Sequence, residues 1–356
     1  MVASWTLSVG RTDLAQTDLA EGTMPAVGDG QALLRVDRVG VTANNVTYGV
    51  LGDSFRYWDF FPAEPGRGVV PLWGFAEVIE SATSGVEVGS RVFGYLPAAS
   101  HLVVAPDRPG PRGFRDASPH RAQLPSVYNA YALTSGDSAY EAEREDLQIL
   151  YRPLFFTSFM LADKLVDNDG YGAEVFVLSS GSSKTAYGTA FLLRETGRQV
   201  VGLTSPGNLA FTESLGCYDQ VLTYDAIGDL ASDVPTAYLD FAGSLRLTAA
   251  LNEHLGSALV HHEVIGVTHQ DPSPIGTLTG TRPTVFFAPE QMRKRTVDWG
   301  REGLDERFAA AWNSFAPVVE GWVDVVVQHG PQALELVWLE VLSGTSPPRT
   351  GHVLTL

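Results

Sequence analysis

The chain has 356 residues, of which 44% are hydrophobic and 18% are charged, so it is long enough for two globular domains with sizeable cores. Its formal net charge of −17 argues against binding DNA or RNA through phosphate neutralisation. The single cysteine excludes a disulfide framework and a thiolate zinc site within one chain. The N-terminus has no signal-peptide pattern, and no run of about 18 apolar residues occurs, so we expect a soluble, cytoplasmic protein without a membrane span.

The first part of the chain is expected to be β structure. Residues 31–41 alternate apolar and polar side chains, which is typical of a half-buried strand. Further strands are expected at 74–80, 91–96 and 101–105, and together they favour a barrel-like module. Residues 106–124 are rich in proline, glycine and arginine, and we expect them to form one long loop.

Residues 47–73 are rich in aromatic side chains, and two interpretations carry equal weight. They form either a small satellite core on the barrel or the wall of an apolar ligand cleft. The aromatic residues of this stretch are Tyr48, Phe55, Tyr57, Trp58, Phe60, Phe61 and Trp73.

Strands and helices alternate after a helix expected at 146–167. The expected strands are 174–178, 199–204, 220–224, 237–242, 258–266 and 284–288, and the helices between them are 184–195, 209–215 and 245–255. This alternation predicts an open, doubly wound parallel sheet. Aromatic-rich helices are expected at 290–342, and a final strand at 350–356.

A turn of small residues at 179–183 joins the first strand of this sheet to its helix. Such a turn aims backbone N–H groups of a helix N-terminus at whatever lies above it, which favours an anion. Gly181 is the only glycine at the positions of the dinucleotide-binding fingerprint, and Lys184 adds a positive charge where phosphate would lie. The serines around Gly181 are Ser180, Ser182 and Ser183. A purely structural turn is the alternative.

Several short motifs occur in a definite order along nearly the whole chain. They lie at 33–45, 73–79 (WGFAEVI), 88–94 (VGSRVFG), 156–158 (FTS), 214–224 (SLGCYDQVLTY) and 342–354 (LSGTSPPRTGHVL). In this order they resemble the medium-chain dehydrogenase/reductase superfamily, as an outlying branch similar to the zinc-free quinone oxidoreductases and enoyl reductases. The resemblance implies a Rossmann-like α/β domain at 145–290 and a GroES-like β-barrel domain at 1–144 that is completed by 291–356. It also implies a homodimer.

The resemblance implies a nicotinamide cofactor in the Rossmann-like domain. NAD-binding proteins place an acidic residue at the end of the second strand, and residues 204–208 (TSPGN) contain none. Their hydroxyl and amide groups suit a 2′-phosphate, so NADP(H) is favoured over NAD(H), with a simple turn as the alternative. The expected cofactor contacts are Ser180, Gly181, Ser182, Ser183, Lys184, Thr185, Thr204, Ser205, Asn208, Tyr224, Phe241, Gly243, Gly266 and Phe287.

Zinc-dependent members of the superfamily bind their catalytic metal through cysteines, and this chain has none before Cys217, so we expect no metal. The resemblance implies reduction of an activated C=C or quinone-type bond in a small apolar or conjugated substrate. Tyr48 is the expected proton donor, although a packing role has equal weight, and Asn45 is expected to bond substrate or ribose. The expected pocket residues are Tyr57, Trp58 and Trp73. The alternative is a non-redox protein that retains the fold, such as a lyase, an isomerase or a binding protein.

Overall fold

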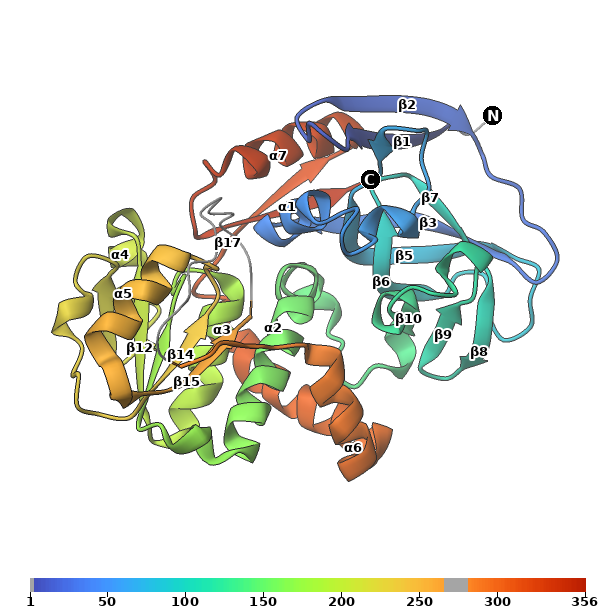
Figure 1. The fold of residues 1–356 in the computed structure, drawn as a ribbon. Coiled ribbons are helices and arrows are strands. Elements are labelled where there is room, and N and C mark those ends of the chain that lie inside the picture. The colour runs from blue at the N-terminus through green and yellow to red at the C-terminus, as the bar shows by residue number, and fades with distance from the viewer. Residues whose placement is uncertain (1–2, 266–280) are drawn as a thin grey trace. The chain divides into compact units, whose positions relative to one another are not determined.

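The computed structural model describes residues 3–265 and 281–356 (Figure 1). The chain divides into two compact units, of which unit 1 is Met1–Leu150 with Val323–Leu356, and unit 2 is Tyr151–Trp322. Helix α6 (Ala288–Val319) therefore belongs to unit 2, although most of it lies in the segment expected to complete the first domain. None of the described helices is both long enough and apolar enough to cross a lipid bilayer.

Unit 1 contains two β-sheets with helices α1 (Ala43–Val50) and α7 (Pro331–Ser343). The smaller sheet has the order β2 (Thr17–Thr23), β1 (Ala3–Gly10), β4 (Arg67–Gly68). The larger sheet has the order β17 (Asp324–His329), β18 (Thr350–Thr355), β3 (Ala32–Val41), β5 (Pro71–Ser81), β6 (Arg91–Pro97), β10 (Ala130–Leu133), β9 (Gly113–Asp116), β8 (Pro106–Gly110), and β7 (His101–Val104) also pairs with β3. Its pairs are antiparallel except for β17 and β18, which are parallel.

Two strands of the larger sheet lie where the sequence predicts other structure. Residues 106–124 were expected to form a loop, but they contain the hairpin of β8 and β9. The two prolines of β8 are tolerated because β8 is the outermost strand, where a missing N–H breaks no inner ladder. At Gly113 (φ +129°) a β-carbon would collide with the backbone of β10, so glycine is required there. Residues 290–342 were expected to form helices, but they contain strand β17. The expectation of helix is therefore wrong for Asp324–His329.

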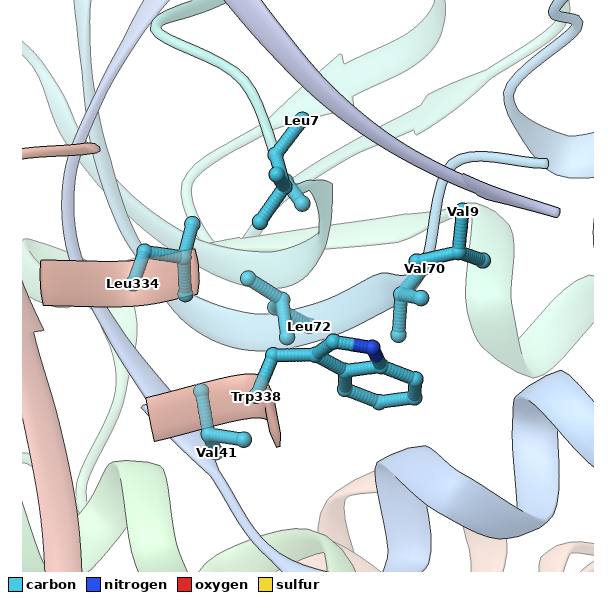
Figure 2. A pocket seen from close by; sticks show the side chains of 8 residues that line it. Leu7, Val9, Val41, Val70, Leu72, Leu334 and Trp338 are labelled. Carbon is cyan, nitrogen blue, oxygen red and sulfur yellow. The ribbon is translucent and has the colours of Figure 1, made fainter. Parts of the chain in front are cut away.

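A small apolar cavity lies in the core of unit 1 (Figure 2). Its lining residues are Leu7, Val9, Val41, Val70, Leu72, Ala98, Leu334 and Trp338. The only polar side-chain atom among them is Nε1 of Trp338, which donates a hydrogen bond to the carbonyl oxygen of Leu14 at 2.9 Å. The wall therefore offers no free polar group to a ligand, and we interpret the cavity as a packing gap.

A buried ion pair fixes the β8–β9 hairpin to the rest of unit 1. The side chains of Asp116 and Arg121 are 0% and 1% exposed, and Nε of Arg121 lies 3.2 Å from Oδ2 of Asp116. Arg121 also donates to the hydroxyl of Tyr131 at 3.1 Å, and its guanidinium lies 4.8 Å from the centre of the Phe61 ring. Oδ1 of Asp116 accepts from the Ser118 hydroxyl at 2.6 Å. Each charge therefore depends on the other, because neither is accessible to water.

Unit 2 is built on a sheet of six parallel strands. Their order is β13 (Gln220–Thr223), β12 (Gln199–Thr204), β11 (Val175–Leu178), β14 (Thr236–Asp240), β15 (Leu259–Val264), β16 (Thr284–Val285). Helices α3 (Lys184–Leu193), α4 (Leu209–Ser214) and α5 (Leu245–Leu255) join strands, and α2 (Glu145–Asp167) leads into the unit from unit 1. This is the strand order of a Rossmann sheet, which places a ligand-binding switch point where the carboxyl ends of β11 and β14 lie side by side.

Both faces of this sheet are covered, as its apolar strands require. On one face, Val177 and Tyr238 pack in a buried cluster with Leu251 of α5. Aromatic side chains of α2 and α6 form a second packed layer, in which the rings of Phe155 and Phe315 stack with their centres 4.3 Å apart. All residues of the central strands β11 and β14 are accordingly buried.

We expect Arg121→Leu to lower the free energy of unfolding by about 3–5 kcal/mol, because it leaves the Asp116 carboxylate buried without its counter-charge. Arg35→Leu is the matched control. Its ion pair with Glu77 is 53% and 36% exposed, so we expect a change below about 1 kcal/mol. Urea unfolding followed by circular dichroism measures both. Equal losses in the two variants would contradict the role given to the buried pair.

Candidate functional site

The turn between β11 and α3 is held from several sides. Ser180 has a left-handed backbone (φ +50°), and its N–H donates to the Tyr224 hydroxyl at 3.1 Å. Gly181 donates its N–H to the Leu203 carbonyl at 2.8 Å, and its own carbonyl accepts from the Tyr218 hydroxyl at 2.8 Å. A β-carbon at Gly181 would lie 3.2 Å from Cγ2 of Thr212, which is a tight contact, and 3.4 Å from the Leu203 oxygen, which is an ordinary one. The sequence thus places its one fingerprint glycine where two backbones meet.

The serines that follow connect the turn to the start of α3 and to the next loop. Ser183 is the N-cap of α3, and its hydroxyl accepts from the N–H of Ala186 at 3.3 Å. The Ser182 hydroxyl accepts from the side-chain amide of Asn208 at 3.1 Å. The first turn of α3 therefore has a capped end and a hydroxyl-rich rim.

A buried carboxylate joins the ends of β11 and β14. Asp240 is 2% exposed, and its Oδ1 accepts from the hydroxyls of Ser179 and Tyr238, each at 2.9 Å. The same oxygen accepts from the N–H groups of Ala242 and Gly243 at 3.0 and 2.9 Å. The Ser179 hydroxyl in turn accepts from the N–H groups of the loop that follows β14. These bonds fix the serine-rich turn (residues 179–183) relative to the loop that follows β14 (residues 241–244), which we call the Asp240 loop.

An unmatched hydroxyl lies at the carboxyl end of β12. Thr204 is 1% exposed, and its Oγ1 has no hydrogen-bond partner in the described part of the chain. A buried polar atom of this kind costs free energy unless a partner is supplied. Ser205 follows it, half-buried, and no carboxylate occurs from there to Asn208. The end of β12 therefore carries a hydroxyl that no described residue bonds, beside the serine-rich turn.

Lys184 is the first residue of α3 and has no ion-pair partner among the residues that the structure describes. Its Nζ lies 5.5 Å from the centre of the Tyr151 ring. The side chain keeps some exposure, but the amine is enclosed by protein, and burial lowers the pKa of Lys184 to about 8. Tyr151 in turn accepts a hydrogen bond from the Tyr187 hydroxyl at 2.8 Å. Within the described chain, the structure therefore gives this enclosed cation no counter-charge.

The remaining residues expected to contact the cofactor lie in separate segments of the chain. Phe241 is 4% exposed and Gly243 has φ +68°, and both belong to the Asp240 loop. The carbonyl oxygen of Thr185 accepts from the Ser158 hydroxyl of α2 at 2.8 Å. Phe287 is 51% exposed at the start of α6, and its side chain makes no ring contact with the other candidates in the described chain. Gly266 lies outside the described residues.

Unit 1 contains a cluster of tyrosines around the expected proton donor. Tyr48 is 5% exposed, and its hydroxyl accepts from the indole N–H of Trp73 at 3.1 Å. The ring centres of Tyr57 and Tyr95 lie 4.7 and 5.4 Å from that of Tyr48. The hydroxyls of Tyr57 and Tyr128 are 3.5 Å apart. Burial raises the pKa of Tyr48 well above its usual range, so the phenol keeps its proton.

Two expected residues of unit 1 have structural roles. The side-chain oxygen of Asn45 accepts from the N–H of Thr42 at 2.7 Å, and its amide donates to the carbonyl of Pro71 at 2.8 Å. Asn45 thus fixes the start of α1, and both its side-chain oxygen and its nitrogen already have partners within unit 1. Trp58 is 1% exposed, and a β-carbon at Gly52 would collide with its indole. Trp58 therefore packs in the core instead of forming a pocket wall.

Residues 39–347 match the model of a family described as "Protein of unknown function (DUF2855)". The chain belongs to this family. A sequence search of curated proteins finds no match. Among residues 3–265 and 281–356, no group of three histidine, cysteine, aspartate or glutamate side chains is arranged to hold a metal ion.

The structure of this DUF2855 chain is similar to several solved structures over its whole length. CurA from Vibrio vulnificus, solved in complex with NADPH, matches with a TM-score of 0.64 and 13% identity, over 99% of this chain and 98% of that chain. The quinone oxidoreductase from Coxiella burnetii gives 0.56 and 13%, over 99% of both chains. A mutant form of enoyl thioester reductase from Candida tropicalis gives 0.57 and 13%, over 100% of both.

These matches confirm the predicted fold, a Rossmann-like sheet with a GroES-like β domain, and the resemblance to quinone oxidoreductases and enoyl reductases. Four residues near the candidate groups are not among the site residues expected from the sequence, although Ser179 lies in the expected turn and Asp240 at the expected strand end. Tyr95 and Tyr128 complete the tyrosine cluster, and Ser179 and Asp240 hold the turn. Tyr95 pairs with Trp73 across β5 and β6, which the strand alternation alone does not reveal.

Proposed function

We propose that this protein is a zinc-independent, NADPH-dependent reductase of an activated C=C or quinone-type bond. The observation that carries the proposal is the carboxyl edge of the unit 2 sheet. There the capped, serine-rich turn lies next to the unmatched Thr204 hydroxyl, and no carboxylate is present at the end of β12. CurA, a structural neighbour, binds NADPH, which supports this choice of cofactor. Zinc independence rests on the absence of cysteine before Cys217.

In this proposal the turn and the end of β12 hold the two phosphate-bearing parts of NADP(H). Gly181 allows the close approach, and the N-terminal N–H groups of α3 face the pyrophosphate. Thr204, Ser205 and Asn208 bond the 2′-phosphate, and Lys184 contributes its positive charge. The orphaned Thr204 hydroxyl gains the partner that the described chain does not give it.

NADPH, when bound, supplies a hydride to the substrate. The contribution of unit 1 is to bind and polarise the acceptor. Tyr48 donates a hydrogen bond to a carbonyl oxygen of the substrate, since burial keeps its proton in place. Tyr57 and Trp73, which are only half-buried, provide aromatic contact surface for a small conjugated molecule. A cytoplasmic homodimer is part of the same proposal.

Titration of the purified protein with NADPH and with NADH, followed by nicotinamide fluorescence, tests the cofactor. We expect NADPH to bind more tightly. Ser205→Asp should weaken NADPH binding by roughly tenfold or more, because the new carboxylate repels the 2′-phosphate, and should spare NADH. Ser205→Asn, which adds a neutral side chain of the same size, is the control and should leave the preference for NADPH unchanged.

Turnover of enones and quinones with NADPH tests the reaction class. Absence of binding by both nucleotides at millimolar concentration would overturn the proposal and favour a non-redox protein that retains the fold. Binding without turnover of either substrate class would retain the cofactor and reject the reaction class.

The lowered pKa of Lys184, about 8, predicts a pH dependence of cofactor binding. The amine is charged below this pKa and neutral above it, so anion binding is strongest at neutral pH and declines as the pH rises. Between pH 7 and pH 9 we expect NADPH affinity to fall by about tenfold. Lys184→Arg should remove this decline, because arginine stays charged, and Lys184→Met should bind weakly at both values. The same decline in all three proteins would exclude Lys184 as its source.

Tyr48→Phe removes the hydroxyl proposed to bond the substrate oxygen and keeps the ring. We expect kcat to fall by about 10²-fold with a small change in KM, because the hydrogen bond strengthens as charge develops on the oxygen. Tyr140→Phe is the control, since its hydroxyl bonds Glu145 at 2.9 Å outside the cluster. Steady-state kinetics and thermal unfolding of both variants separate a chemical role from lost packing, and an unchanged kcat in Tyr48→Phe would assign Tyr48 to packing.

A further inference from the structure

Strand β17 leaves one edge of the larger sheet of unit 1 without a partner strand in the described chain (Figure 1). Its parallel pairing with β18 includes a hydrogen bond from the Asp324 N–H to the Arg349 carbonyl at 2.8 Å. Because backbone groups alternate along a strand, Val325 and Val327 direct their N–H and C=O groups away from β18. No segment of the described chain bonds to these outward groups.

The free edge is also apolar. Val325, Val326 and Val327 are 36%, 38% and 39% exposed, and consecutive residues of a strand point to opposite faces. Both faces of β17 therefore present valine to solvent. Proteins usually protect such an edge with lysine, proline, a bulge or a covering segment, and the sequence DVVVQH contains neither lysine nor proline. An unpaired edge of this composition favours addition of another strand.

We propose that β17 pairs antiparallel with β17 of a second copy of this chain, around a two-fold axis at Val326. A two-fold antiparallel pair requires one residue to face its own copy, and the outward residues of one strand must meet the outward residues of the other. With Val326 facing itself, Val325 exchanges backbone hydrogen bonds with Val327 of the second copy. All three valines of each strand then lie against valines.

The charges of the strand suit a second copy of the same chain. In this register Asp324 lies opposite Gln328, so a carboxylate meets an amide and no like charges face each other. Oδ2 of Asp324 already lies 3.2 Å from Nε of Arg349, which offsets the carboxylate charge. A register centred on Val327 would instead set Val326 against Gln328 and lose apolar contact. The strand is therefore complementary to itself, despite a net charge of −17 for the whole chain.

Cysteine cross-linking tests the register directly. Val326 belongs to a non-hydrogen-bonded pair in the proposed interface, where the two Cα atoms lie about 4.5 Å apart, a separation that a disulfide spans. The one native cysteine, Cys217, is buried and does not interfere. Under mild oxidation we expect Val326→Cys to form a covalent dimer on a non-reducing gel. Val325→Cys, which faces Val327 of the second copy, and Val297→Cys, 85% exposed on α6, are controls that should remain monomeric on the gel.

Light scattering over a series of protein concentrations tests the dimer without oxidation. The native chain should approach twice its monomer mass. Val326→Lys sets two like charges opposite each other at the axis, so we expect its dimer dissociation constant to rise by about tenfold or more. Val297→Lys is the matched control and should dimerise as the native chain does.

The inference rests on the homodimer of the proposed function, for which it names the interface, and does not depend on the reductase activity. It is overturned if the native chain stays monomeric at every concentration, if Val326→Lys dimerises normally, or if Val326→Cys cross-links no better than Val297→Cys. Circular dichroism of each variant confirms that a lost dimer reflects the interface and not an unfolded chain.

Discussion

The carboxyl edge of the unit 2 sheet depends on one buried carboxylate. Burying a charged oxygen is costly unless donors replace its water, and Oδ1 of Asp240 receives hydrogen bonds from two hydroxyls and two backbone N–H groups. Because one of these hydroxyls belongs to Ser179, the same bonds that satisfy the carboxylate also position the turn before α3. Any ligand bound there meets a surface whose geometry is set by β11 and β14 together.

This arrangement explains how a turn with one fingerprint glycine can keep its shape. Ser180 adopts a left-handed backbone that costs a residue with a β-carbon roughly 1 kcal/mol, and the Tyr224 hydroxyl bonds its N–H in that conformation. The Tyr218 hydroxyl donates a hydrogen bond to the carbonyl of the next residue, Gly181. Two tyrosines from the β13 region thus stabilise a conformation that glycines would adopt without support. The turn therefore differs from the fingerprint in what stabilises its backbone, because tyrosine hydroxyls bond groups that glycines would leave unsupported.

Periodicity in the sequence predicts most of the fold, because β3, α2 and the strands of unit 2 bury continuous or alternating apolar faces. Periodicity fails to predict a strand whose composition is explained only by its position in the sheet. Strand β8 carries prolines that an inner strand would exclude, and its place at the sheet edge is not visible in the sequence. Strand β17 is a short valine run between two helices. The aromatic stretch of 47–73 shows no period, so the enclosed Trp58 and the half-buried Tyr57 cannot be told apart before the structure places them. The sequence also predicts Asn45 as a substrate ligand, because an asparagine that fixes a helix start and one that binds a substrate cannot be told apart by residue type.

The tyrosine cluster of unit 1 bears on the choice between a reductase and a lyase or isomerase that retains the fold. Proton abstraction needs a base whose pKa lies near the working pH. Burial shifts the pKa of Tyr48, Tyr57, Tyr95 and Tyr128 upward, away from that range, so all four phenols keep their protons. The Tyr95 hydroxyl is buried and lacks a partner in the described chain. A cluster of protonated phenols can donate hydrogen bonds to a carbonyl oxygen, and it has no member suited to remove a proton from carbon. This protonation state is compatible with the proposed reduction of an enone or quinone, in which the carbonyl oxygen gains charge and accepts a hydrogen bond.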